Sequence, residues 1–250
     1  MRVGRTCLAA SSLLLLAAVA ESRTLPKGAQ FTDQFPLERC AEFATHTGAG
    51  AGGGARNQYF PLVVDRVWSL SNANCVAAGD CDELEEVRVS VLGETQVVDG
   101  VTTRVVEERE WVDGELEEVS RNFFVECVGT EDVYYFGEEV VDGDGNPLDG
   151  GWLAGTDDAR PGVIFPGGAF LLGARYFQEV APGVALDRAE HKASGLEFNA
   201  NGFAYSDCVL VEDTNGLSDP KGKNPDAKVY CPDIGIVMDE ELELTNILLP

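Results

Sequence analysis

The stretch VTTRVVEEREWVDGELEEVSRNFFVE, from Val101 to Glu126, decides the fold class. Two runs rich in β-branched and aromatic residues lie on either side of Asp113, which is followed by glycine. A second Asp-Gly pair, at Asp99, comes just before the first run. Asp-Gly readily adopts the positive φ angles that a two-residue hairpin turn requires. We therefore predict consecutive antiparallel strands joined by tight turns.

The same pattern continues on both sides of this stretch. Upstream, Val87, Val89 and Val91 alternate with polar residues, a period of two that places one face of a strand on a core. Downstream, further strand-like segments follow, namely VYYFGEEVV, RYFQEV, FAYSDCVLVED, AKVYCP and IGIVMDEELEL. No long apolar stripe has helical spacing, so the expected helix is minor and falls in LERCAEFATH. The chain is predicted to be mainly β, an antiparallel meander.

The beginning of the chain has a different composition. Residues 1–20 contain two arginines, an apolar run and Ala-Val-Ala, a pattern typical of a secretory signal peptide. Residues 21–56 are interpreted as a flexible N-terminal arm that ends in the glycine-rich linker GAGAGGGA. Residues 57–250 are predicted to form a single antiparallel β domain. We therefore expect a secreted or periplasmic protein without a transmembrane segment.

Charge restricts the class of partner. The formal net charge is −25, from 43 acidic and 18 basic residues. Such a chain repels phosphate backbones and anionic lipid surfaces, which excludes nucleic acid as a partner. An unknown small molecule, a cation or a basic partner is the expectation.

Six cysteines follow the predicted signal peptide, an even number that predicts three disulfides in an exported chain. Six cysteines allow 15 connectivities. The two nearest in sequence flank a short loop, and the two nearest the C-terminus lie on strands that we expect to form one hairpin, which leaves the third pair by elimination. The expected pairs are Cys75–Cys81, Cys208–Cys231 and Cys40–Cys127. Zinc is disfavoured because there is no Cys-x-x-Cys motif.

The segment DGDGNPLDG has two interpretations. Its oxygen-bearing side chains suit a calcium ion, and the candidate ligands are Asp142, Asp144, Asn146 and Asp149. The EF-hand template fails, because Pro147 replaces its glycine and Leu153 replaces its final glutamate. A looser calcium site and a plain hairpin turn both remain, and no other cofactor is expected.

Catalytic templates are absent. The chain has no G-x-S-x-G elbow, no H-E-x-x-H motif and no glycine-rich phosphate loop. His46 lies in the predicted arm and His191 in a charged segment, so both are expected to be exposed instead of serving as bases. A pair of carboxylates of the glycosidase kind is defined by its separation in space, and the sequence neither marks nor forbids one. The aromatic residues on strands suit a core or a sugar-stacking groove; these are Trp68, Trp111, Trp152, Tyr134 and Tyr135.

NQYFPLVVDRVWSL, from Asn57 to Leu70, resembles the N-x-Y-F-P-L-x-x-G-x-x-W entry motif of a group of exported bacterial proteins of uncharacterised function. The similarity continues, in the same order, as far as Glu243. The chain departs from the group's pattern at Asp65, where glycine is usual, in its last two cysteines, and in its acidic turn. The resemblance implies a curved sheet or half-barrel around an apolar interior, and it brings no catalytic residues.

Together these observations predict a secreted, non-enzymatic acidic β protein with a binding or structural role. Two alternatives are a calcium-stabilised surface or adhesion module and a secreted carboxylate-dependent hydrolase.

Overall fold

A computed structural model describes residues 30–46 and 57–250, and strands dominate this part of the chain. Among the described residues, no helix has the length and apolar character needed to cross a membrane. The strands of the main sheet are β2 (Val67–Ser71), β3 (Glu85–Val98), β4 (Val101–Val112), β5 (Glu115–Cys127), β6 (Val133–Asp142), β8 (Arg160–Phe165), β9 (Arg175–Phe177), β10 (Glu179–Val180), β11 (Asp187–Ala200), β12 (Phe203–Asn215), β13 (Asp226–Cys231), β14 (Gly235–Asp239) and β15 (Leu242–Leu248).

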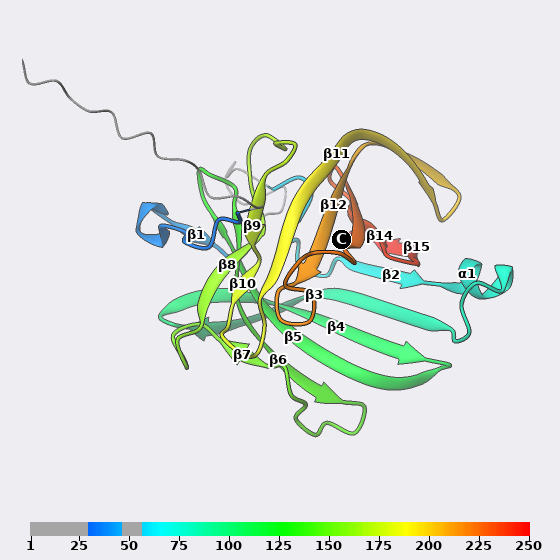
Figure 1. The fold of residues 1–250 in the computed structure, drawn as a ribbon, viewed down its shortest axis with the longest axis horizontal. Helices are drawn as coiled ribbons and strands as arrows, with labels where there is room; N and C mark the ends of the chain where they lie inside the picture. Colours follow the sequence, from blue (N-terminus) through cyan, green and yellow to red (C-terminus); the bar gives the residue numbers. More distant parts are fainter. Residues whose placement is uncertain (1–29, 47–56) are drawn as a thin grey trace, which may run out of the picture.

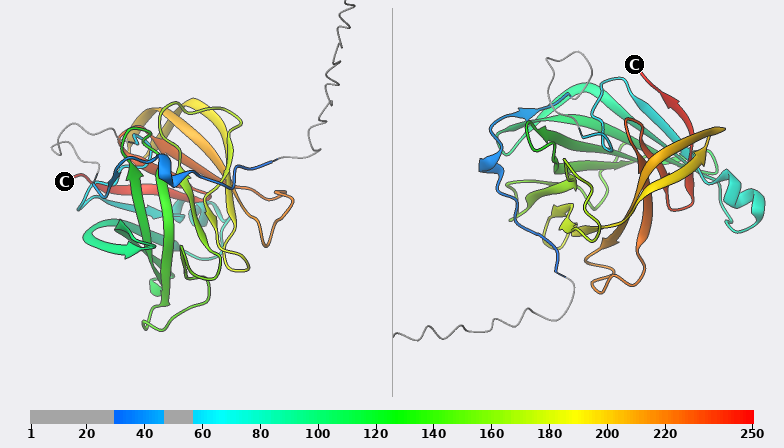
Figure 2. Two further views of the ribbon diagram at one scale, coloured as in Figure 1. Left: turned by 90° about the vertical axis from the view of Figure 1, so that its left-hand side faces the viewer. Right: turned by 90° about the horizontal axis from the view of Figure 1, so that it is seen from above.

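These strands form one antiparallel sheet that curls into a nearly closed barrel. Their order is β10-β8-β6-β5-β4-β3-β2-β15-β14-β13-β12-β11-β9, and the short strands β1 (Phe43–Ala44) and β7 (Trp152–Leu153) pair with β5 and β6. The long strands β3 to β6 lie opposite the β11–β12 hairpin, and the strands curve around one interior (Figures 1 and 2). The predicted curved antiparallel meander is confirmed, and the curvature continues almost to closure.

One seam separates the two ends of the sheet, β9 and β10. Only Gln178 lies between these strands in the sequence, so the chain itself crosses the seam. Its backbone N–H donates to the carbonyl oxygen of Asp187 at 2.8 Å, on the neighbouring strand β11. The barrel is therefore closed at this point by covalent continuity together with a hydrogen bond.

The two Asp-Gly turns adopt the predicted conformation. Asp99 and Gly100 have φ angles of 47° and 77°, and Asp113 and Gly114 have φ angles of 49° and 85°. They connect β3 to β4 and β4 to β5. Asp65 also has a positive φ, of 68°. This is the left-handed region that glycine adopts most easily.

The three predicted cysteine pairs are confirmed. Cα atoms lie 5.6 Å apart in Cys40–Cys127, 5.3 Å apart in Cys75–Cys81 and 4.1 Å apart in Cys208–Cys231. The last pair links β12 to β13, and Cys75–Cys81 encloses most of the helix α1 (Ala73–Ala78).

The described part of the N-terminal arm packs on the barrel. Strand β1 pairs with the end of β5, beside the Cys40–Cys127 disulfide. The helix expected in LERCAEFATH is wrong except for one 3₁₀ turn, η1 (Leu37–Arg39). Cys40 and the β1 pairing hold the rest of that segment extended against the sheet. The predicted signal peptide and the whole glycine-rich linker lie outside the described residues.

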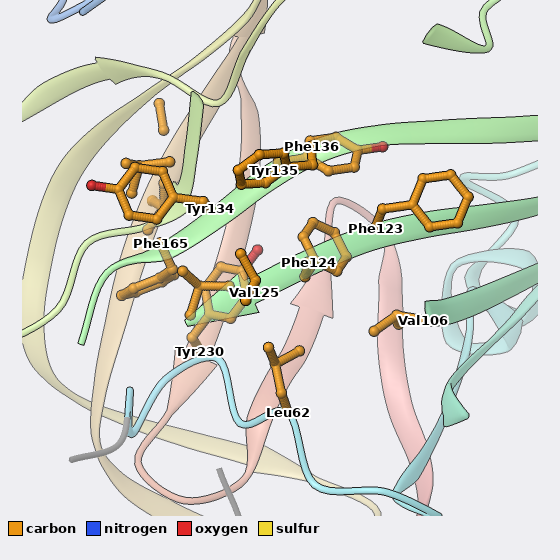
Figure 3. Packing of buried hydrophobic residues seen from close by; sticks show 14 of the residues in the cluster. Leu62, Val106, Phe123, Phe124, Val125, Tyr134, Tyr135, Phe136, Phe165 and Tyr230 are labelled. Atoms are coloured by element: carbon orange, nitrogen blue, oxygen red, sulfur yellow. The ribbon is translucent and has the colours of Figure 1, made fainter. Parts of the chain in front are cut away.

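Aromatic side chains fill much of the interior (Figure 3). The rings of Phe124 and Tyr135, on neighbouring strands, have centroids 4.7 Å apart, and Trp152 packs edge-on against Tyr135 at 5.2 Å. Trp68 is also buried. Trp111 is instead half-buried, with the Arg88 guanidinium 5.4 Å from its ring. Apart from Trp111, the strand aromatics considered above are buried in the core.

Candidate functional site

A cavity of about 300 Å³ occupies the interior of the barrel. Its wall is apolar at some positions and acidic at others. The apolar wall includes Phe60, Leu62, Trp68, Val91, Val106 and Phe124. Seven carboxyl side chains also line it, those of Glu108, Glu138, Glu179, Asp187, Asp213, Asp226 and Asp239. Lys228 is the single cationic side chain among the described residues that line the cavity.

The entry segment NQYFPL places its own side chains in the cavity wall. Asn57 is buried, and its amide nitrogen lies within hydrogen-bond distance of the carbonyl oxygens of Glu131, Phe165 and Pro166. Its amide oxygen accepts the backbone N–H groups of Tyr59 and Phe60. Asn57 thus fixes the turn that follows it. Through these hydrogen bonds it holds the NQYFPL segment in place as part of the cavity wall.

The fixed segment meets the sheet through apolar contacts. The Phe60 ring packs edge-on against Phe124, with centroids 5.1 Å apart. Leu62, which is 1% exposed, projects from its segment toward β5 (Figure 3). Trp68 donates its indole N–H to the carbonyl oxygen of Ile234 at 2.8 Å, so this ring also has a fixed orientation. The apolar wall is therefore preformed.

The acidic wall is assembled from many strands. Glu108 comes from β4, Glu138 from β6, Asp187 from β11 and Asp213 from β12. These strands are far apart in the sequence, and closure of the barrel brings their side chains into one space. Repulsion between the carboxylates of Glu108 and Glu138, and between those of Asp187 and Asp213, raises the free energy of their charged forms.

Lys228 is held by two of these carboxylates. Its Nζ lies 3.2 Å from Asp239 Oδ2 and 3.6 Å from Asp213 Oδ2. Burial alone would lower the pKa of Lys228, but Asp239 and Asp213 raise it well above the ordinary value. The side chain therefore stays an ammonium ion and is no nucleophile at neutral pH.

Several carboxyl groups hold protons unusually tightly. Burial, with the nearby charges of Glu110 and Asp239, raises the pKa of Glu108 to about 8. Burial likewise raises the pKa of Glu138 to about 7 and that of Asp213 to about 6. Titratable groups with strongly shifted pKa values in a cavity are typical of functional sites. The cavity therefore carries both protonated and ionised carboxyl groups near neutral pH.

Two further polar contacts order the wall. Tyr135 donates its hydroxyl proton to Asn122 Oδ1 at 2.5 Å, and burial raises the pKa of Tyr135 well above the ordinary value, so the phenol remains protonated. Glu179 Oε1 accepts the backbone N–H of Asp187 at 2.9 Å, and burial followed by repulsion from the Asp187 carboxylate raises the pKa of Glu179 well above normal.

The acidic turn lies elsewhere, between β6 and β7. Asp142 Oδ1 accepts the backbone N–H groups of Asp144 and Asn146, and the Asn146 amide also donates to this carboxylate. Asp144 and Asp149 are exposed. The four predicted ligands thus share one loop whose internal hydrogen bonds occupy Asp142. No group of three or more histidine, cysteine or acidic residues suited to a metal occurs in ranges 30–46 and 57–250. Both interpretations of the turn, a calcium site and a plain hairpin turn, stay predictions.

The expectation that His191 is exposed is wrong. This residue lies on β11, is 2% exposed, and stacks on the ring of Phe170 at 3.8 Å. Its Nδ1 lies 3.2 Å from the Leu171 carbonyl oxygen and its Nε2 lies 3.1 Å from the Tyr176 hydroxyl. Burial lowers the pKa of His191 to about 4, so the ring is neutral. The charged neighbours in the sequence point to the other face of the strand, which is why the segment resembles a solvated one.

The acidic cavity wall was not predicted, although a signal for it exists. Glu108 stands two residues after Val106, so the period of two places both on the same face of β4. Carboxylates at core-facing positions of a strand therefore mark a polar interior. No family model, no curated protein and no solved structure matches this chain.

Proposed function

We propose that this protein is an exported, non-enzymatic binding protein that holds a small molecule inside its barrel. The observation that carries the proposal is the cavity of about 300 Å³, with a preformed apolar wall and a polar wall. Ligand sites are commonly concave, largely apolar, and equipped with a few polar groups that fix orientation. The arrangement thus suits an uncharged or cationic molecule with an apolar part.

Export is supported by the three disulfides, because such bonds persist in oxidising compartments. Cys40–Cys127 joins the arm to the barrel, Cys75–Cys81 closes the loop that contains α1, and Cys208–Cys231 links β12 to β13. A cross-linked barrel loses less conformational freedom when a ligand binds, which favours affinity.

The proposal can be tested with a substitution that fills part of the cavity. Val106 is 4% exposed and lines the cavity, so Val106→Phe reduces the space available to a ligand. Val97, which is 62% exposed on β3, provides the matched control Val97→Phe. Isothermal titration calorimetry with benzyl alcohol, cyclohexylmethanol and 1-naphthylmethanol measures binding. We expect at least one alcohol to bind the parent and the Val97 variant, and to bind the Val106 variant at least tenfold more weakly. Failure of all three alcohols, and of the amines that correspond to them, to bind the parent would contradict the proposal.

The carboxylate-dependent hydrolase is a second candidate, favoured by one specific observation. Glu108 and Asp213 line one cavity, and burial raises the pKa of Glu108 to about 8 and that of Asp213 to about 6. Different pKa values suit a proton donor and an ionised partner. Turnover of aryl glycosides by the parent, lost in both Glu108→Gln and Asp213→Asn, would establish hydrolysis in place of simple binding.

A further inference from the structure

The acidic wall of the cavity has more negative groups than the protein neutralises. Seven carboxyl side chains and one ammonium group from the described part of the chain line it. Lys228 is already engaged by Asp239 and Asp213. Burying carboxylates without a countercharge is costly, so the surplus has to take up protons or a cation.

The contacts of Asp213 favour the second possibility, uptake of a cation. It is 7% exposed, and its Oδ2 lies 3.3 Å from the Gln178 amide nitrogen and 3.6 Å from Lys228 Nζ. Its Oδ1 is buried and has no hydrogen-bond partner among the described residues. An unsatisfied buried carboxylate oxygen carries the desolvation penalty of a charged group. A donor from a ligand would remove that penalty.

Glu108 and Glu138 line the same cavity as Asp213. Glu108 is surrounded by protein, yet it keeps accessible surface because it lines the cavity. Glu138 does the same from β6. Within the described residues, neither side chain forms an ion pair, whereas Asp213 and Asp239 both pair with Lys228. These two carboxyl groups can therefore change from protonated to ionised when a positive charge arrives.

We infer that the cavity takes an organic amine, an inference that rests on the proposed function. The ammonium group lies among Glu108, Glu138 and Asp213. The hydrocarbon part lies against the apolar wall, where Trp68 and Phe124 offer ring surfaces. Anionic amphiphiles, such as fatty acids, are excluded because their carboxylate would meet like charge.

Binding of a cation has a proton signature that a neutral ligand lacks. Since burial raises the pKa of Glu108 to about 8 and that of Glu138 to about 7, both are partly protonated at neutral pH. An ammonium ion favours their ionised forms and expels protons to the buffer. The charged groups that face these two residues from the surrounding strands are Glu110, Glu118, Asp187, Lys228 and Asp239.

The test compares each alcohol above with its matched amine, namely benzylamine, cyclohexylmethylamine and 1-naphthylmethylamine. Titration at about pH 7 in phosphate and in MOPS, at equal ionic strength, separates proton release from binding heat. We expect an amine to bind at least tenfold more tightly than its alcohol, and to release protons where the alcohol releases none. Equal affinities, or no proton release, would overturn the amine assignment and leave the proposed function standing. Failure of every alcohol and amine would overturn both.

A matched pair of variants locates the site. Glu138→Gln removes a charge from the cavity, whereas Glu139→Gln makes the same change at the next residue of β6, which is exposed. We expect the amine preference to fall at least threefold in the first variant and to be unchanged in the second. Alcohol affinity should be the same in both, which shows that the barrel is intact. A loss of amine preference in the Glu139 variant alone would place the cation outside the cavity.

Discussion

Inside the barrel, the ammonium group of Lys228 lies 3.2 Å from the carboxylate of Asp239. The side chain is 27% exposed, and this exposed surface faces a cavity. Removing one partner of this ion pair lowers the stability of the fold, because the other charge is left in a poorly solvated position.

Replacement of Lys228 by methionine should therefore destabilise the protein. We expect a loss of about 3 to 5 kcal/mol in the free energy of unfolding at about pH 8, measured by urea denaturation. The loss should shrink at about pH 5, because the released carboxyl groups can then take up protons. Lys221→Met, at an exposed lysine, is the control and should change stability by less than about 0.5 kcal/mol. An equal loss at both pH values would show that the charge of Lys228 is not what matters.

Glu108 makes the stability of the protein depend on pH. Its pKa is raised by burial from 4.5 to about 8 in the folded state, so between these values the folded protein holds a proton that the unfolded chain releases. Stability contributed by the neutral carboxyl is thus fully present below about pH 4.5 and is lost as the pH rises through about 8.

The variant Glu108→Gln should remove this dependence. We expect it to be more stable than the parent by roughly 2 to 4 kcal/mol at about pH 9 and nearly equal to it at about pH 5. Thermal unfolding across this pH range is the measurement. Glu107→Gln, at the neighbouring position on β4, should leave the parent's pH profile unchanged. A steep decline that persists in the Glu108 variant would assign the effect to other carboxyl groups.

Asn57 should be essential for the wall of the cavity. Replacement by alanine removes its buried hydrogen bonds to several backbone groups and should cost about 2 to 4 kcal/mol. Asn74→Ala, which removes an exposed contact with Glu243, should cost less than about 1 kcal/mol. Chemical denaturation compares the two. Equal losses would mean that Asn57 has no special part in holding the entry segment.

The disulfides should differ in their contribution to stability. Removal of Cys40–Cys127, which spans 87 residues, should cost about 4 to 5 kcal/mol, and removal of Cys208–Cys231, which spans 23, about 3 kcal/mol. Double alanine variants and urea denaturation measure both values. The reverse order would indicate that the unfolded chain is already restricted near the N-terminal arm.

Calcium should leave the melting temperature unchanged. The Asp142 carboxylate already accepts the backbone N–H groups of Asp144 and Asn146, so a metal would compete with the turn itself. Thermal unfolding in EDTA and in millimolar calcium at equal ionic strength is the measurement. A rise in calcium that disappears in Asp144→Asn would instead establish the site that the sequence suggests.

Features that depend on neighbouring residues were predictable. The Asp-Gly turns at Asp99 and Asp113 need only local backbone angles, and they formed as expected. The pairing of Cys208 with Cys231 followed from one hairpin. These inferences require no knowledge of how the sheet closes.

Features that depend on closure were not predictable. A strand that carries both apolar and acidic residues has two faces, and the sequence alone does not say which face meets the interior. Glu108 shares a strand face with Val106, but the sequence does not show that this face meets the interior, and Asp213 resembles the many carboxylates of a highly acidic surface. His191 was misplaced for the same reason, because its charged neighbours conceal a buried position. Only the order of the strands around the barrel separates these cases.

The seam at Gln178 limits what the barrel can hold. A sheet whose edges meet only through hydrogen bonds can widen by breaking them, but here the first and last strands are joined by a single residue of chain. The side-chain amide of Gln178 also donates to the carboxylate of Asp213, at 3.3 Å. Widening the barrel at this point would therefore require the chain around Gln178 to change conformation as well as hydrogen bonds to break. If the proposed binding function holds, this connectivity restricts the width of the ligand independently of its charge.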